Sequence, residues 1–183
     1  MTGAIDITMC REVPAAVIRS GVQRVFLNRL RRARNYVRRV VVISPWITAQ
    51  DERSCPFSSL IQLIRSRSIA TYVFTRSPST AAHTEAAESL RSCPTVELIY
   101  NDNVHAKIYA CLAPPPHAFA LLGSANLTAN SITLYEIGLL ILGISAGSSI
   151  VADLGNFGLQ HLRTRPESKV VKRIDVRSIR HAI

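Results

Sequence analysis

The first half of the chain alternates between two hydrophobic spacings. Over residues 22–37 apolar side chains recur every three or four positions, which is the spacing of a helix with one buried face. Residues 40–43 are an uninterrupted β-branched run that ends at Ser44-Pro45, which predicts a central strand. Further helices are predicted from Pro56 and from Ser79 or Thr80, and further strands at residues 71–75 and 96–100. Such alternation favours an α/β sandwich whose early strands pair in parallel.

The second half of the chain lacks this regular alternation. Strand candidates at residues 105–111, 117–122 and 135–142 follow one another without a helical pattern between them. The linker between the first two is too short for a parallel crossover, so we expect these two strands to pair antiparallel. A helix is predicted within residues 148–164. The basic tail, residues 166–183, is expected to form an edge strand or an arm.

The charge balance is unusual for a chain of otherwise ordinary globular composition. The 183 residues include 22 Lys and Arg against 12 Asp and Glu, which gives a formal net charge of +10 at pH 7. Such a surface attracts polyanions, of which nucleic acid is the commonest and anionic lipid headgroups come next. A basic protein whose charges only keep it dispersed has the same composition. Charge alone does not choose among these interpretations, and the arginine-rich face of residues 24–39 is open to the same alternatives.

Cysteine usage and hydropathy bear on where the protein resides. The four cysteines, Cys10, Cys55, Cys93 and Cys111, include no C-x-x-C pair, so neither a zinc site nor a disulfide framework is predicted. The first residues lack the cationic and apolar stretches of a secretory signal. The most apolar stretch, residues 137–152, is shorter than the roughly 20 residues of a membrane-spanning helix. We expect free thiols, no membrane partner and residence in the cytoplasm.

Candidate chemistry is concentrated in the second half of the chain. In a strand that starts at His105, this residue and Lys107 project from one face because side chains alternate. Ser124 and Asn126 are likewise two residues apart, behind Gly123, whose missing side chain lets a ligand approach the backbone. An imidazole, an ammonium group, a hydroxyl and an amide are thus predicted to converge.

This set of side chains suits the cleavage of a phosphodiester. A histidine can attack phosphorus or protonate a leaving oxygen, while Lys and Asn bind the nonbridging oxygens and stabilise the charge that develops there. The fixed charge of the lysine takes the place of a metal cation, and the sequence offers no carboxylate cluster that would bind one. We therefore predict neither a metal nor a cofactor.

The spacing of these residues resembles the signature of the phospholipase D superfamily, which runs His-x-Lys-x4-Asp-x6-Gly-Ser-x-Asn and is followed by a strand with an acidic residue. The matching residues are His105, Lys107, Gly123, Ser124, Asn126 and Glu136, with looser similarity at Ser44-Pro45-Trp46. The resemblance implies an α/β fold, an αβα sandwich with a mixed, largely parallel central sheet. We expect a single such domain over residues 1–183, with its core at about residues 20–165.

Two departures separate the chain from this signature. Leu112 stands where the family places its aspartate, and no acidic residue occurs between Lys107 and Gly123. The spacing from the lysine to the glycine is also four residues longer, which Ala113-Pro114-Pro115-Pro116 account for. Some nuclease and restriction-endonuclease branches of the family lack this aspartate, so the resemblance still implies activity.

The resemblance assigns a catalytic role to four residues. It implies that His105 is the nucleophile that forms a phosphohistidine and that Lys107 and Asn126 bind the phosphate. Glu136 would orient the imidazole, since a carboxylate on one ring nitrogen fixes the tautomer and stabilises the charged form. Glu136 also stands alone before an apolar run, so it needs a partner if it is buried.

Substrate contacts and a partner subunit are expected as well. Gly123 and Ser124 would contact the substrate, Ser124 through a hydrogen bond, and Trp46 either lines the site or packs in the core. Family members use two His-x-Lys motifs, whereas this chain has one. We therefore expect a homodimer in which the two copies of His105 face each other across a two-fold axis.

The residues and the charge together predict a metal-independent endonuclease, with DNA favoured over RNA. Two other hypotheses remain open. A phospholipid phosphodiesterase would use the same chemistry, and a noncatalytic nucleic-acid-binding module would explain the loss of the aspartate at Leu112. No role is predicted for His83, His117, His161 or His181, and Cys111 is expected to be a small buried residue.

Overall fold

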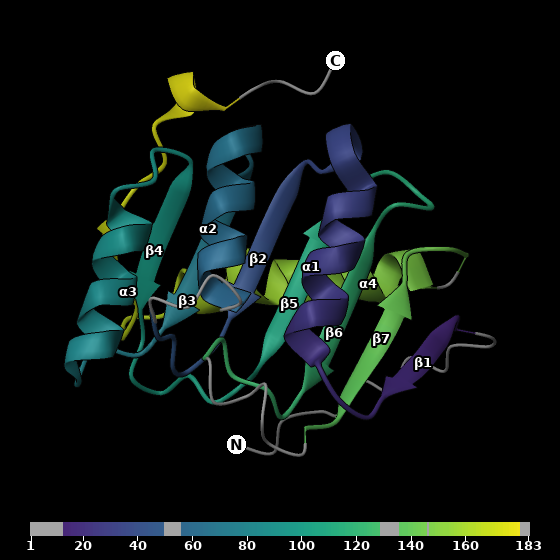
Figure 1. Cartoon of the computed structure of the whole chain (residues 1–183), viewed down its shortest axis with the longest axis horizontal. Helices are drawn as coiled ribbons and strands as arrows, with labels where there is room; N and C mark the ends of the chain where they lie inside the picture. The colour runs from purple at the N-terminus through teal and green to yellow at the C-terminus, as the bar shows by residue number, and fades with distance from the viewer. Residues whose placement is uncertain (1–12, 50–55, 129–135, 146, 180–183) are drawn as a thin grey trace.

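An eight-stranded sheet forms the centre of the computed structural model (Figure 1). The structure describes residues 13–49, 56–128, 136–145 and 147–179. Across the sheet the strands lie in the order β1-β7-β6-β5-β2-β3-β4-β8. Their bounds are Ala15–Ile18 (β1), Arg39–Ile43 (β2), Ala70–Thr75 (β3), Val96–Tyr100 (β4), Ile108–Leu112 (β5), Phe119–Gly123 (β6), Gly138–Leu142 (β7) and Lys169–Lys172 (β8).

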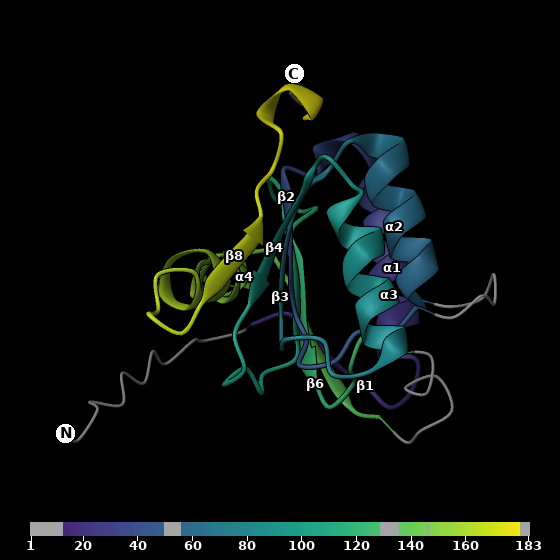
Figure 2. The same cartoon turned by 90° about the vertical axis from the view of Figure 1, so that its left-hand side faces the viewer.

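Helices cover both faces of this sheet. On one face lie α1 (Val22–Ala33), α2 (Pro56–Arg67) and α3 (Ala81–Arg91), side by side (Figures 1 and 2). On the other face lies α4 (Gly147–Asn156), which continues as a π-helical turn, Phe157–Leu162 (Figure 2). Short 3-10 turns are found at Arg34–Tyr36 and Val176–Ser178. These layers confirm the predicted αβα sandwich.

The sheet is mixed, but the expected predominance of parallel pairing is wrong. Among the described strands, the pairs β2·β3 and β3·β4 are parallel and the other five pairs are antiparallel. The two parallel pairs are joined by helical crossovers, α2 from β2 to β3 and α3 from β3 to β4, whereas β5, β6 and β7 follow one another without a described helix between them. The expected antiparallel pairing of residues 105–111 with 117–122 is confirmed, because β5 and β6 form a hairpin.

The predicted elements are present, and several of them have shifted ends. The helix expected over residues 22–37 ends at Ala33 and passes into a 3-10 turn. The strand expected from residue 105 begins only at Ile108, so His105 and Lys107 precede it. The tail contributes β8, which pairs with β4 as an edge strand. The opposite edge strand, β1, was not predicted, because its residues are mostly exposed and show no alternation.

Each face of the sheet packs against its own apolar core. The larger core lies between the sheet and the three helices α1, α2 and α3, and the smaller one lies under α4. Alternate residues of β2 supply the two cores, since Val40 and Val42 belong to the larger and Val41 and Ile43 to the smaller. An uninterrupted β-branched run is what a strand buried on both faces requires.

Two expectations concern the chain as a whole: that it has no membrane partner, and that it is one domain with its core at about residues 20–165. The described segments contain no helix with the length and hydropathy needed to cross a membrane. The strands β1 and β8 lie outside residues 20–165 and form the two edges of the sheet. A single domain over residues 1–183 stays a prediction.

Candidate active site

The residues singled out in the sequence gather on one side of the sheet, where four strands start or end. β2 and β6 end on this side, and β5 and β7 begin there, because β5 runs antiparallel to β2 and β6, and β7 antiparallel to β6. α1 also begins there, since a side chain at Gly138, the first residue of β7, would collide with Val22. We call this side the site end of the sheet and the opposite side the far end. The site end is the lower one in Figure 1.

His105 and Lys107 precede β5 at the site end. His105 is exposed, and Lys107 is half-buried, with its Nζ donating to the carbonyl oxygen of His105 over 3.2 Å. The backbone N–H of Gly123 donates to the carbonyl oxygen of Lys107 over 3.3 Å, which holds Lys107 beside the Gly-Ser segment. An accessible imidazole next to an ammonium group is an arrangement suited to attack on an anionic phosphodiester.

Ser124 and Glu136 form the most closely connected part of the site. The hydroxyl of Ser124 donates to the carboxylate of Glu136 and accepts from the N–H of Ile137 over 3.1 Å. The N–H of Ser124 in turn donates to the carbonyl oxygen of Ile137 over 3.0 Å. Glu136 is only 8% exposed, so its carboxylate needs the partner that Ser124 provides. The predicted contact between Glu136 and the imidazole of His105 stays a prediction.

Gly123 is explained by the packing of two strands. A Cβ atom at this position would collide with the carbonyl oxygen of Ile137 and would lie 2.8 Å from the Cα atom of Gly138. The backbones of β6 and β7 therefore approach each other closely where Ser124 turns toward Ile137. The glycine was expected to let a ligand approach the backbone, whereas the close approach of β7 already accounts for a glycine here.

Asn126 lies in the loop after β6, next to the first turn of α1. The Nε2 group of Gln23 donates to the carbonyl oxygen of Asn126 over 2.6 Å. The hydroxyl of Tyr109 donates to the carbonyl oxygen of Ala125 over 2.8 Å, and burial raises the pKa of Tyr109, so the donor stays protonated. Two buried side chains thus hold this loop by its backbone. The Oδ1 atom of Asn126 is buried without a hydrogen-bond partner among the described residues, which leaves an acceptor for a further donor.

Trp46 follows β2 and is tied to the loop after β6. The hydroxyl of Ser44 donates to the carbonyl oxygen of Trp46 over 2.8 Å and accepts from the N–H of Leu127 over 3.0 Å. Ile47 and Leu127 form an isolated parallel bridge. The Trp46 side chain is 38% exposed, and the guanidinium carbon of Arg76 lies 4.7 Å from the ring centroid. Trp46 is therefore not part of the core, and its contact with substrate stays a prediction.

The segment before His105 is fastened to the loop after β3. Ser77 donates to the carboxylate of Asp102 from its backbone N–H over 2.7 Å and from its hydroxyl over 3.1 Å. These two hydrogen bonds, the backbone one first, lower the pKa of Asp102, so the carboxylate stays charged at neutral pH. The Nε group of Arg76 donates to the carbonyl oxygen of Val104 over 3.0 Å. The backbone leading to His105 is thus held while its side chain stays exposed.

Both departures from the phospholipase D signature lie at the far end of the sheet. Leu112 is the last residue of β5, about 17 Å along the chain from Lys107. It is half-buried and packs against Gly155 of α4, where an added Cβ atom would lie 2.7 Å from a Leu112 methyl group. The extra residues 113–116 belong to the turn between β5 and β6. Neither departure removes a side chain from the site end.

The remaining thiols and histidines lie apart from the site. Cys93 and Cys111 are buried free thiols, and burial raises the pKa of Cys111 to about 12, which confirms the expected small buried residue. Cys10, Cys55 and His181 lie outside the described residues.

His117 stacks on a tyrosine ring with centroids 3.8 Å apart, in the segment leading into β6 at the far end. Within the described ranges, no three His, Cys, Asp or Glu side chains come together in a group that could hold a metal ion.

Sequence reasoning missed the residues that hold the site loops in place, Gln23, Arg76 and Tyr109. Gln23 carried a signal, because it is a polar residue next to the apolar stripe of a predicted helix, and it is only 1% exposed. Tyr109 shares the alternation of Lys107 and was open to the same argument. Nothing in the pattern around Arg76 indicated that its side chain reaches both Trp46 and the segment before His105.

Known proteins resemble this chain in structure, whereas searches by sequence find no match. No protein-family model matches the sequence, and no curated protein matches it. Nuc from Salmonella typhimurium, a phospholipase D family member, is similar with a TM-score of 0.60 and 14% identity, over 88% of this chain and 100% of that one. NucT from Helicobacter pylori is similar with a TM-score of 0.56 and 17% identity, over 81% and 97%. The chain has a phospholipase D-like fold.

This fold also recurs inside larger proteins. The polyphosphate kinase of Porphyromonas gingivalis is similar over 84% of this chain and 26% of that one, with a TM-score of 0.62 and 19% identity. The phospholipase D-like fold confirms the resemblance that the spacing from His105 to Glu136 indicated. At these low identities the likeness establishes the fold, and the chemistry has to be argued from the site itself.

Proposed function

We propose that this protein with a phospholipase D-like fold is a metal-independent hydrolase of phosphodiester bonds, an endonuclease that prefers DNA to RNA. The observation that carries the proposal is that the segment of Lys107 and the segment that begins at Gly123 lie side by side at the site end. The Gly123 N–H donates to the carbonyl oxygen of Lys107, and His105 is exposed two residues before Lys107. These segments carry the groups that bind and attack a phosphodiester. The formal charge of +10 favours a polyanionic substrate.

In the proposed reaction one ring nitrogen of His105 attacks the phosphorus atom. A P–N bond forms as the P–O bond to the leaving oxygen breaks, and a proton is delivered to that oxygen. Water then attacks the phosphohistidine, the P–N bond breaks, and the imidazole returns with release of a phosphomonoester end. Lys107 and Asn126 bind the nonbridging oxygens in both steps, and Glu136 orients the imidazole.

We further propose that the active enzyme is a homodimer, because the first step needs an acid and the chain carries one His-x-Lys pattern. The partner's His105 would supply that proton. An apolar patch beside Gly123 supports the contact: Val17 and Ile137 are 60% exposed and Leu139 is 41% exposed. Val17 and Leu139 are cross-strand neighbours, so these side chains form one continuous surface that a second copy would cover.

The dimer is tested with one charge placed on the patch. Leu139→Asp is expected to sediment as a monomer and to lose activity, because a carboxylate in an apolar interface is costly to desolvate. Ile144→Asp is the matched control, since Ile144 is also exposed and lies outside the patch. Sedimentation velocity and cleavage assays are run on the same samples. A wild-type monomer with full activity would contradict the dimer.

The activity is tested on single-stranded and double-stranded DNA and RNA in EDTA, with products resolved on denaturing gels. Wild type and His117→Ala are expected to cut, and His105→Ala is expected not to cut. His117 is the matched control because it lies at the far end of the sheet. No cutting by wild type would contradict the nuclease. Turnover of phospholipid vesicles would then favour a lipid enzyme, and DNA binding unaffected by His105→Ala would favour a noncatalytic module.

The proposal places the protein in the cytoplasm. Its support is the cysteine usage, since Cys93 and Cys111 are unpaired thiols, which persist in a reducing compartment. Cell fractionation with a tagged chain checks this, and recovery in an extracellular fraction would contradict it.

A further inference from the structure

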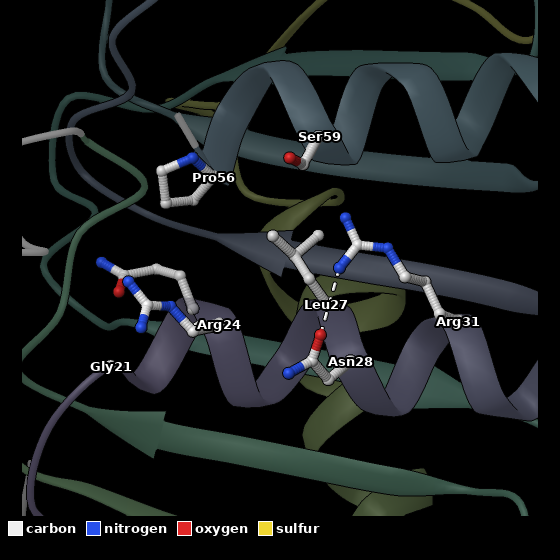
Figure 3. A pocket seen from close by; sticks show the side chains of 8 residues that line it. Gly21, Arg24, Leu27, Asn28, Arg31, Pro56 and Ser59 are labelled. Carbon is white, nitrogen blue, oxygen red and sulfur yellow. Dashed lines mark hydrogen bonds between the residues drawn. The ribbon is translucent and has the colours of Figure 1, made fainter. Parts of the chain in front are cut away.

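A groove with two arginines in its lining runs between α1 and α2, starting at the site end. It has a volume of about 290 Å³. Arg24, Asn28 and Arg31 line it from α1, and Pro56 and Ser59 line it from α2 (Figure 3). The guanidinium groups of both arginines project into the space between the helices, and one NH group of Arg31 donates to Oδ1 of Asn28 over 3.1 Å. The groove therefore presents a row of hydrogen-bond donors, and no carboxylate belongs to its described lining.

The charge of α1 runs against the usual preference of a helix. The positive end of the helix dipole favours acidic residues in the first turn, yet α1 has none there and carries Arg24 instead. The first turn of α2 has no acidic residue either. Three more arginines follow along α1, at Arg29, Arg31 and Arg32. Burial first, and then the charge of Arg32, lower the pKa of Arg29, so the arginines of this helix oppose one another.

The groove is connected to the candidate active site by Gln23. Gln23 lines the groove and its Nε2 group donates to the carbonyl oxygen of Asn126 over 2.6 Å. Its Oε1 atom is buried without a hydrogen-bond partner among the described residues. A buried acceptor without a donor is costly in a folded protein, so this atom indicates the place of an ordered water, since a phosphodiester has no hydrogen to donate. The groove and the loop of Asn126 thus share one side chain.

We infer that the groove between α1 and α2 binds the phosphate backbone of the substrate strand next to the bond that is cut. The inference rests on the proposed function and extends it, because it gives the strand a path away from His105. Phosphate oxygens accept from Arg24, Asn28 and Arg31, and the negative charge relieves the excess positive charge at the start of both helices.

The dimensions of the groove agree with a nucleic-acid strand. Arg24 and Arg31 are seven residues apart on a helix, a rise of about 10 Å. One strand of a B-form duplex presents a phosphate about every 3.4 Å along its axis, so the rise between the two backbone positions corresponds to about three phosphate steps. Leu27 forms the apolar floor of the groove between them. Such a surface contacts the backbone and not the base edges, so it adds affinity without sequence preference.

The test compares two pairs of arginines. The groove variant is Arg24→Gln with Arg31→Gln, and the matched control is Arg32→Gln with Arg38→Gln. All four side chains are exposed, and each pair removes two charges, but the control pair does not line the groove. Glutamine has a helix propensity close to that of arginine, so both variants are expected to fold like the parent. Circular dichroism and thermal unfolding establish this first.

Binding is measured in the His105→Ala background with EDTA present, so that cleavage does not interfere. The probe is a fluorescein-labelled single-stranded DNA of about 20 nucleotides. Its binding is followed by fluorescence anisotropy at salt concentrations from about 25 to 200 mM, where phosphate contacts dominate the affinity. The logarithm of the association constant falls linearly with the logarithm of the salt concentration. The groove variant is expected to make this slope shallower by about 1.4, because two phosphate contacts at about 0.7 each are lost. The control pair is expected to lower it by less than half of that.

Each outcome bears on the groove separately from the nuclease. Equal losses for the two variants would overturn the inference, because the general charge of the protein would then explain binding. Binding to phosphatidylglycerol vesicles that depends on Arg24 and Arg31, with no DNA binding, would overturn it as well. Groove-specific DNA binding by a wild type that does not cut would support the groove and reject the nuclease. If the wild type cuts DNA but the groove variant binds DNA as well as the control pair does, the nuclease is supported and the groove is rejected.

Discussion

The two ends of β5 are built in different ways. At the site end, hydrogen bonds from several elements hold Lys107, Ser124 and Asn126, and two buried polar atoms remain without partners among the described residues. At the far end, Leu112 packs against Gly155 through apolar contact, and three consecutive prolines follow in the turn. The site end keeps the phospholipase D signature, and the far end contains both departures from it.

This difference shows that the residues of one sequence motif can lie in separate parts of the fold. The lysine and the aspartate of the signature are five positions apart in sequence, yet here the two positions lie at opposite ends of a strand. The leucine in the second position packs between β5 and α4, away from the groups at the site end. The place of a residue in the fold, rather than its membership in the motif, decides what its loss means.

The largest contrast is expected from removing one charge at each end of the sheet. Lys107→Gln is expected to lower kcat by about 10² to 10³, because a fixed charge at the developing phosphate oxygens is lost. Arg38→Gln removes an exposed charge near Leu112 and is expected to change kcat less than about twofold. Single-turnover cleavage of DNA measures both. Equal losses would show that only the overall field matters.

A second contrast concerns the packing at the site end. Gly123→Ala is expected to destabilise the protein by about 2 to 3 kcal/mol, because the new Cβ atom collides with the backbone of β7. The displaced Ser124 should lower activity as well. Urea unfolding checks the stability, and a change of less than about 0.5 kcal/mol would mean that Gly123 is not required by packing.

A third contrast restores the family residue at the far end. Leu112→Asp is expected to cost about 1 to 2 kcal/mol of stability, because a carboxylate replaces an apolar contact with α4. No gain in kcat is expected, since the position is far from His105. Leu112→Met, which conserves volume, is the control and should be nearly neutral. An increase in kcat for Leu112→Asp would show that the aspartate acts on the site.

The smallest contrast is in the dependence of stability on pH. His83 is 1% exposed, its Nε2 lies 3.2 Å from the Thr75 hydroxyl, and burial lowers its pKa. The folded protein holds His83 neutral, so the stability it contributes is present above its ordinary pKa of about 6.5 and is lost as pH falls below it. The loss is at most about 1.4 kcal/mol per pH unit. Thermal unfolding at pH 7 and pH 5 should show a smaller drop for His83→Gln than for wild type, whereas the exposed His161→Gln should behave like wild type.

Local patterns in the sequence were sufficient for many elements and for selecting candidate residues that lie at the site end. The strand predicted at residues 96–100 matches β4 at both ends, because a proline precedes it and all five residues are buried. The residues from His105 to Glu136 were found because their spacing is a local property of two adjoining strands and a loop. These features depend on neighbours that are close in the chain.

Features that depend on distant residues were not predicted. The order of the strands in the sheet places β1 beside β7, whose residues are more than a hundred positions away. The bond from Gln23 to the backbone of Asn126 spans 103 positions. The direction of β5 relative to β2 was not predicted either, because these two antiparallel neighbours are not consecutive in the chain. Periodicity in one segment carries no information about such pairs.

The bridge between Ile47 and Leu127 has a consequence for motion. It lies beyond the first residue of β5, where the continuations of β2 and β6 meet directly, and the N–H of Thr48 donates to the carbonyl oxygen of Leu127 over 3.2 Å. The loops that carry Trp46 and Asn126 are therefore fastened to each other as well as to the sheet. They are expected to open as one cooperative unit, so their amide hydrogens should exchange with deuterated water at a common rate.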